Sequence, residues 1–179
     1  MEQAKAELVA AGPTGEGVPL DDRYRIRSVR TADEAAVLGM FAQSSPGDIR
    51  ARCLGAIKNF PSEAAARLSR CDGGQEIALV AEKSRSDGAA EIVGLVHLVD
   101  FPDEPGLAEF DIMVRSDVQG QGVGHRLMKA ILSRARARGL GALVGYVSGE
   151  NGAMLAIAGK LGFRFERLAA GVVKITSHL

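Results

Sequence analysis

The chain has 179 residues, the length of one ordinary domain, and a chain of this size can bury a full hydrophobic core. Hydrophobic residues make up 46% and charged residues 25%, as in soluble globular proteins, while 22 basic residues balance 22 acidic ones. The neutral charge and an aromatic content of only 4% argue against a nucleic-acid partner. No apolar run approaches the length of a membrane-spanning helix, so no membrane association is expected.

Residues 1–22 are rich in turn-forming residues and show no periodicity, which predicts a flexible tail ahead of a single domain over 23–179. The start of the chain is charged and lacks a continuous apolar stretch, so a secretory signal is not expected. The two cysteines, Cys53 and Cys71, match no metal-binding spacing and are interpreted as reduced packing thiols. We therefore predict a cytoplasmic protein without a metal.

The first half of the chain combines one strand with three helices. Residues 24–29 alternate in polarity and predict a strand, and the capping box over 31–34 predicts the start of a helix. Ser45-Pro46 is expected to open a second helix that ends near Ile57. Ser62 is expected to cap a third helix that ends near Arg70.

The second half alternates strands with helices. A glycine-rich loop over 119–124 precedes a segment in which apolar residues recur every four positions, the pattern of a helix that runs to about residue 138. The strands are expected at 77–81, 92–99, 107–114, 142–147, 163–167 and 172–175, and a further helix at 151–161. This order predicts a mixed α/β fold.

The glycine-rich loop is the sharpest local signal. Glycines between a strand and a helix let the backbone approach a ligand closely, and the free N–H groups of the first helical turn can bind a pyrophosphate. No acidic residue lies between 118 and 141, and the helix carries five basic residues: Arg126, Lys129, Arg134, Arg136 and Arg138. The alternative is an ordinary glycine turn before a solvated helix.

Two familiar phosphate-binding loops do not fit. A dinucleotide fingerprint requires Gly or Ala where His125 stands and an acidic residue at the end of the next strand, where Val147 and Ser148 stand. A Walker loop requires Ser or Thr after Gly159-Lys160, and Leu161 follows instead.

The pattern Gln-x-x-Gly-x-Gly at Gln119, Gly122 and Gly124 resembles the acetyl-CoA signature of the GNAT superfamily of N-acetyltransferases. Asn151 with Leu161-Gly162-Phe163 resembles the second cofactor motif of that superfamily, and the likeness runs from about residue 24 to 175. It implies a mixed, mostly antiparallel, splayed sheet with helices on both faces, and acetyl-CoA bound where two strands diverge. The residues that it assigns to acetyl-CoA are Met113, Val114, Gln119, Gly120, Gln121, Gly122, Val123, Gly124, His125 and Asn151.

A finer likeness concerns the acceptor. Ala108-Glu109-Phe110, together with Glu150-Asn151, resembles the bacterial Pat-type protein lysine acetyltransferases. This resemblance implies that Glu109 is the general base and that a protein lysine is the acceptor, for example on an acyl-CoA synthetase. A small amine as acceptor and a non-catalytic acyl-CoA sensor are the alternatives. Many superfamily members place a proton-donating Tyr where this chain has Ala158, so the thiolate lacks an obvious donor.

The strand at 107–114 carries the expected chemistry. Its alternation places Glu109, Asp111 and Met113 on one face, expected to face the cleft, and an apolar set on the other, expected to pack under helices. At pH 7 a lysine amine with a pKa near 10.4 needs about 4.6 kcal/mol to lose its proton, a cost that a base in the cleft lowers. Asp111 is left open between substrate contact and solvated surface, and Glu109 has the same alternative.

The remaining polar residues are less informative. A backbone N–H near Met113 or Val114 is expected, by resemblance, to stabilise the developing oxyanion. Tyr146 is a candidate proton donor to the thiolate, although a strand tyrosine is more often part of the core. His97 is interpreted as a strand histidine with satisfied hydrogen bonds.

Overall fold

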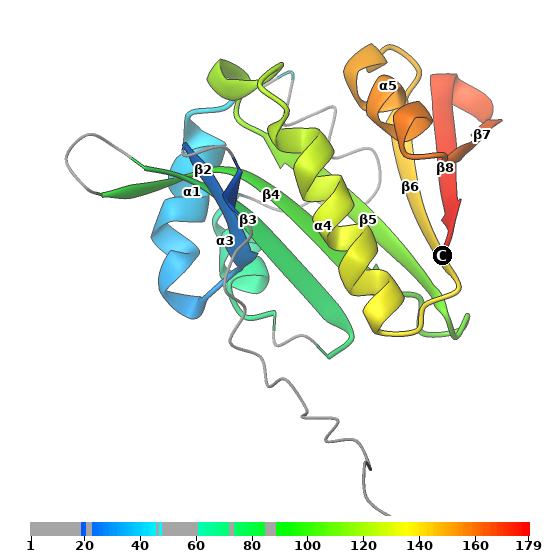
Figure 1. The fold of residues 1–179 in the computed structure, drawn as a ribbon, viewed down its shortest axis with the longest axis horizontal. Coiled ribbons are helices and arrows are strands. Elements are labelled where there is room, and N and C mark those ends of the chain that lie inside the picture. Colours follow the sequence, from blue (N-terminus) through cyan, green and yellow to red (C-terminus); the bar gives the residue numbers. More distant parts are fainter. Residues whose placement is uncertain (1–18, 21–22, 46, 48–60, 72–73, 85–88) are drawn as a thin grey trace, which may run out of the picture.

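The structure, a computed structural model, describes residues 19–20, 23–45, 47, 61–71, 74–84 and 89–179. In these residues eight strands form one sheet in the order β1-β2-β3-β4-β5-β6-β8-β7 (Figure 1). All neighbouring pairs are antiparallel except β5 and β6, which are parallel. The strands are β1 (Pro19–Leu20), β2 (Tyr24–Ser28), β3 (Glu76–Ser84), β4 (Ala90–Asp100), β5 (Leu107–Val114), β6 (Ala142–Ser148), β7 (Arg164–Arg167) and β8 (Val172–His178).

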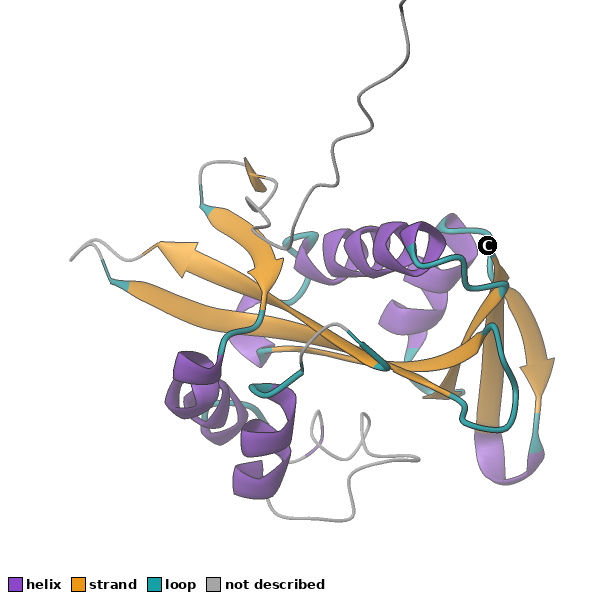
Figure 2. Ribbon diagram, turned by 90° about the horizontal axis from the view of Figure 1, so that it is seen from below, coloured by secondary structure: helices purple, strands orange, loops and turns teal. Residues whose placement is uncertain are grey.

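Helices cover both faces of this sheet, as Figure 2 shows. They are α1 (Glu34–Ala42), α3 (Pro61–Leu68), α4 (Val123–Ala137) and α5 (Gly152–Lys160). The second helix expected from the sequence, over 45–57, lies almost entirely outside the described residues, as does Cys53. None of the described helices is long and apolar enough to span a membrane. The predicted mixed α/β fold with helices on both faces is confirmed.

Each face of the sheet has its own apolar cluster. On one face, α4 buries Leu127, Ile131 and Ala135, the residues whose four-residue spacing predicted the helix. On the other face, α1 and α3 pack their buried residues against β3, β4 and β5, where Leu95 and Met113 belong to the same cluster. The central strands β3, β4 and β5 are therefore packed on both faces.

The start of α1 differs from the predicted capping box over 31–34. The capping box lies one residue earlier, at 30–33, where it opens a 3-10 turn (Thr31–Asp33) ahead of α1, and the carboxylate of Asp33 accepts a hydrogen bond from the backbone N–H of Arg30 at 2.7 Å. The same carboxylate is held at 2.6 Å by the buried side chain of Arg27, which fixes its position. Likewise α3 begins at Pro61, ahead of the predicted cap at Ser62, as expected for a proline in a first turn.

The sheet opens between β5 and β6. The two strands pair only over Leu107–Glu109 and Ala142–Val144. Just beyond this pairing the ring of Phe110 lies against Gly145, where a Cβ would stand 2.7 Å from ring atoms. The same ring packs edge-on against Phe163, with centroids 5.8 Å apart. The aromatic ring thus occupies the place where the strands separate, and the splayed sheet expected from the sequence is confirmed.

Candidate active site

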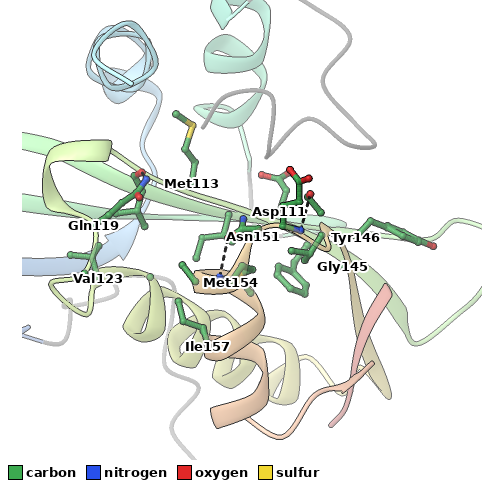
Figure 3. A pocket seen from close by; sticks show the side chains of 18 of the residues that line it. Asp111, Met113, Gln119, Val123, Gly145, Tyr146, Asn151, Met154 and Ile157 are labelled. Atoms are coloured by element: carbon green, nitrogen blue, oxygen red, sulfur yellow. Dashed lines mark hydrogen bonds between the residues drawn. The ribbon is translucent and has the colours of Figure 1, made fainter. Parts of the chain in front are cut away.

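A cavity of about 420 Å³ lies where β5 and β6 diverge. Its walls come from β5, β6, the glycine-rich loop and the first turns of α4 and α5 (Figure 3). At one end lies the loop before α4, and at the other the carboxylates of Glu109 and Asp111 on β5. The cavity therefore brings the expected phosphate-binding loop and the expected base into one cleft.

The loop has the geometry that a pyrophosphate requires. Gly122 is the N-cap of α4 at φ +82°, and no side chain caps this helix end, so the N–H groups of the first turn are not used by a cap. Gly120 has a φ of +74°, and a Cβ at either glycine would point into open space. Gly124 is different, because a Cβ there would stand 3.2 Å from Ile157 on α5. Two glycines thus shape the loop, and the third allows α4 and α5 to pack closely.

Two glutamines fix the loop from within. The side-chain amide of Gln119 donates to the carbonyl of Val114 at 3.1 Å. Gln121 accepts from the hydroxyl of Tyr24 and donates to the carbonyl of Asp117 at 3.3 Å. Of the residues that the sequence assigned to acetyl-CoA, those lining the cavity are Met113, Val114, Gln119, Gly120, Val123, Gly124 and Asn151, whereas Gln121, Gly122 and His125 lie outside its lining.

Only part of the basic set on α4 lies near the loop. Arg126 and Lys129 are exposed in the first half of the helix. Arg134 lies twelve residues beyond the N-cap, about 18 Å at 1.5 Å per residue, and Arg136 lies farther still. Arg138 pairs with Asp100 at 2.5 Å. Arg134 and Arg136 thus lie in the last turn of α4, where they complement the C-terminal end of the helix dipole, and only Arg126 and Lys129 of this set lie in the half of the helix next to the loop.

Arg115, which the sequence did not single out, anchors the approach to the loop. Its side chain is buried and contacts the carboxylate of Asp117 at 2.6 and 2.9 Å. It also binds Glu91 on β4 and the side-chain carbonyl of Gln43 after α1, the latter at 3.1 Å. Because these partners lie in three separate segments, no local sequence pattern could have revealed this role.

The backbone of β5 directs alternate N–H groups into the cleft. Phe101 N–H donates to the carbonyl of Leu107, and Arg115 N–H donates to Val93 on β4. Since hydrogen-bonded residues alternate along an antiparallel strand, the N–H of Met113 also faces β4. The N–H of Val114 then points toward the opened side, where β6 has diverged. Of the two expected oxyanion donors, Val114 is the one that the ladder leaves available to the cleft.

The two carboxylates of β5 influence each other. Burial raises the pKa of Glu109, and the negative charge of Asp111 raises it further, while His97 acts in the opposite direction. A raised pKa brings a carboxylate nearer to that of the amine whose proton it must accept. Two carboxylates at one end of a cleft also attract a cationic amine.

The expectation that one face of β5 lines the cleft needs correction. Both faces lie under helices, and residues of both faces line the cavity because it opens at the strand edge. Met113 is buried in the cluster of α1 and α3, and Figure 3 shows its side chain on the opposite side of β5 from Met154 and Ile157. The cavity lies at the edge of β5 because β5 and β6 pair over only a few residues. The alternating pattern of β5 alone does not reveal this.

His97 connects Asp111 on β5 to Glu76 on β3 across the intervening strand β4. Its Nδ1 lies 3.2 Å from an oxygen of Asp111, and its Nε2 lies 3.1 Å from an oxygen of Glu76 on β3. Glu76 in turn pairs with Arg67 at 2.7 Å. Although burial opposes it, the hydrogen bonds from Arg67 and His97 hold the pKa of Glu76 below its usual value. The prediction that His97 is a strand histidine with satisfied hydrogen bonds is confirmed, but the sequence did not predict its partners.

Cys71 lies at the outer end of this row. Its Sγ is 3.6 Å from an oxygen of Glu76, and the two groups form with His97 a cluster of three potential metal ligands within 4.8 Å of one another. The hydrogen bonds of Glu76 to Arg67 and His97 account for the arrangement without further ligands.

Asn151 and Tyr146 complete the cleft on the β6 side. The side-chain carbonyl of Asn151 caps α5 by accepting from the N–H of Met154 at 3.0 Å. Tyr146 lines the cavity and is half-buried rather than part of the core. Figure 3 shows its hydroxyl extending away from the other labelled side chains. Asn151 thus fixes the helix start at the cleft, and the orientation of Tyr146 does not favour contact with a thiolate.

A relative that is named for an acetyltransferase activity shares part of the sequence. An L-methionine sulfoximine/L-methionine sulfone acetyltransferase of Pseudomonas paraeruginosa is 36% identical over 81 residues, which are 44% of this chain and 47% of that protein. The match thus spans about half the length of this relative.

Solved structures share the fold over most of the chain. The GNAT domain of S. lividans PAT superposes with a TM-score of 0.75 at 21% identity, covering 87% of this chain and 90% of that one. The yncA protein of Salmonella typhimurium, solved with its cofactor acetyl-CoA, gives a TM-score of 0.70 at 19% identity, covering 88% and 94%. A model of the acetyltransferase (GNAT) family matches residues 48–163. The chain therefore belongs to the GNAT family of acetyl-CoA-dependent acetyltransferases.

Proposed function

We propose that this protein transfers an acetyl group from acetyl-CoA to a primary amine, with Glu109 as the general base. The observation that carries the proposal is the position of Glu109, the last residue of β5 paired with β6, at the wall of the cleft and with a raised pKa. A base there removes the proton of the amine and leaves a nucleophilic nitrogen. The amine attacks the thioester directly, without a covalent enzyme intermediate.

The glycine-rich loop would hold the coenzyme in this proposal. Gly120, Gly122 and the uncapped N-terminus of α4 would receive the pyrophosphate, and Arg126 with Lys129 would add positive charge. The N–H of Val114 would donate to the carbonyl oxygen that gains negative charge. The acetyl group would then lie between this N–H and Glu109.

The acceptor that we favour is a lysine side chain of a protein, such as an acyl-CoA synthetase. Three carboxylates, those of Glu109, Asp111 and Glu150, line the described part of the cavity, and no Lys or Arg does so. A lysine side chain enters such a site as a cation alone. A free amino acid carries its own carboxylate next to the amine, and that group finds no cationic partner among the described lining residues.

A small amine is the second candidate. The relative from Pseudomonas acts, by its name, on methionine sulfoximine and methionine sulfone, and it shares 36% identity over 81 residues with this chain. A thiol-release assay with acetyl-CoA, run against lysine-bearing proteins, lysine peptides, methionine sulfoximine and other free amino acids, separates the two candidates. Thiol release with the proteins and peptides supports the first, and release with the free amino acids alone refutes it. Acetyl-CoA binding without turnover on any amine would identify a non-catalytic sensor.

A further inference from the structure

The row of charged side chains that crosses the sheet next to the cleft is not explained by the acetyl-transfer site. Its members come from four elements: Arg67 from α3, Glu76 from β3, His97 from β4 and Asp111 from β5. His97 is only 5% exposed and lies on the face of the sheet where α1 and α3 pack an apolar cluster. Burying charged and titratable groups among apolar side chains is unfavourable unless they are paired.

The two ring nitrogens of His97 point in opposite directions along this row. Nδ1 meets Asp111, which lines the cleft, and Nε2 meets Glu76, whose side chain is 27% exposed. An imidazole can take up a proton at one nitrogen and release one from the other. His97 thus bridges a carboxylate that lines the cleft and a carboxylate on β3 that reaches solvent.

Acetyl transfer creates a need for such a connection. A C–N bond forms and the thioester C–S bond breaks, and the nitrogen loses two protons between its ammonium form and the amide. The departing thiolate takes one of these protons, so one must leave the cleft in each turnover. When an acceptor and acetyl-CoA fill the cleft, this proton needs a path that does not cross the substrates.

We propose that His97 is a proton-relay and positioning residue that carries the released proton from Asp111 to Glu76 and thence to solvent. This proposal rests on the proposed acetyl-transfer function. The ammonium group of the acceptor, which has three N–H donors, contacts both Glu109 and Asp111, so that each carboxylate can receive one proton. Asp111 passes its proton to Nδ1 of His97, and Nε2 releases one to Glu76. Arg67 holds Glu76 in place.

Among the described residues, the charged and titratable groups around His97 come from each packed element. They are Glu76 from β3, Asp111 and, beyond it, Glu109 from β5, Cys71 from the segment after α3, and Arg67 behind Glu76. Asp111 and Glu109 interact through their charges, which attract the cationic amine to both.

The test uses His97→Asn and Glu76→Gln in the full chain. Asn keeps an N–H donor near the position of Nδ1, so it can hold Asp111, but it cannot take up and release a proton. We expect kcat to fall about 10-fold to 100-fold in each variant, with KM and acetyl-CoA affinity near wild type. Raising the concentration of a small buffer should restore part of the rate, because the buffer removes the proton. Cys71→Ser, which alters a neighbour of Glu76 outside the relay, should retain the wild-type rate.

Wild-type kcat in His97→Asn at low buffer concentration would refute the relay, as would a loss that no buffer restores. If the wild-type protein acetylates no amine, the proposed function fails, and a measurement without turnover decides on the relay. The ring nitrogens of His97 give separate 15N resonances: Asp111→Asn should shift that of Nδ1, and Glu76→Gln that of Nε2. Unchanged resonances in both variants would show that the groups are not coupled and overturn the proposal.

Discussion

Replacing Glu109 by Gln tests whether Glu109 is the general base of the proposed acetyl transfer. Gln keeps the size and hydrogen-bonding ability of the side chain but cannot accept a proton at neutral pH. Glu109 lies on β5 away from the glycine-rich loop, so acetyl-CoA affinity should hardly change. We expect a fall in kcat of about 10²-fold to 10⁴-fold, the usual contribution of a general base.

The pKa of the amine sets the scale of this effect. At pH 7 the pH lies about 3.4 units below the amine pKa of about 10.4, so roughly one amine in 2,500 is neutral. Removing the proton therefore costs about 4.6 kcal/mol. A base can recover at most this amount when it acts only by removing that proton. The loss in Glu109→Gln should therefore shrink as the pH approaches the pKa of the amine, where the substrate loses its proton unaided.

The acid side of the pH profile provides a second measurement. The carboxylate form of Glu109 is the active one, and because burial and Asp111 raise its pKa, activity should fall at a pH above the usual value of 4.5. Asp111→Asn removes the repulsion and should move this acid limb to lower pH. The raised pKa also means that ionised Glu109 destabilises the fold, since its stabilising contribution is present below the unfolded pKa and lost as the pH rises through the folded pKa. Glu109→Gln should therefore melt no lower than wild type at pH 7.

Steady-state kinetics of both variants from pH 5 to 10, with thermal melts as the control for folding, decide this prediction. Near-wild-type kcat in Glu109→Gln at pH 7 would refute the assignment and point to Asp111. Tyr146→Phe is the matched control on the other side of the cleft, and it should reduce kcat far less because the hydroxyl extends away from the labelled cleft side chains in Figure 3.

The other predictions concern the coenzyme loop and the stability of the fold. Acetyl-CoA at 100 times its Kd should stabilise the wild type by about 2.7 kcal/mol. Gly122→Val should abolish the thermal shift. Gly139→Val should keep it, because Gly139 has a similar φ of +76° but lies beyond the far end of α4. A retained shift in Gly122→Val would mean that the loop does not hold the coenzyme. Gly145→Ala should destabilise the protein by about 1–3 kcal/mol in urea unfolding, because the new methyl group meets the ring of Phe110 at 2.7 Å, and unchanged stability would show that the ring moves freely. Arg27→Met should reduce the free energy of unfolding by about 3–5 kcal/mol because it leaves two carboxylates without their buried cation, and a loss below 1 kcal/mol would contradict the pairing.

Much of the fold could be predicted because its signals are local. The range of β5 agrees with its alternating pattern, and α4 follows from apolar residues spaced by four. The glycines at 120 and 122 adopt the left-handed backbone that other residues avoid, so their place between a strand and a helix predicted a tight loop. The sequence pattern also predicted a helix from Asn151, and the structure adds that the side chain of Asn151 caps α5, while its role toward acetyl-CoA stays a prediction from the family resemblance.

Other features depended on contacts that no local pattern encodes. The capping box expected at 31–34 lies one residue earlier, at 30–33, where the carboxylate of Asp33 also pairs with Arg27 from the preceding strand. The distance of Arg134 and Arg136 from the loop follows only from the length of α4. The cleft was expected on one face of β5, whereas it opens at the strand edge.

The sequence by itself determined the order of the elements, the glycine-rich loop and the carboxylates of β5, because each depends on backbone preferences and polarity within a few residues. Only the tertiary structure decided that β5 and β6 part after Glu109, which turns a strand edge into a cleft. The same holds for the row from Arg67 to Asp111, whose members are up to 44 residues apart and meet only because β3, β4 and β5 pair in one register. Strand register is a property of the whole sheet, since it is fixed by packing on both faces at once, and the single sequence does not contain it in any one segment.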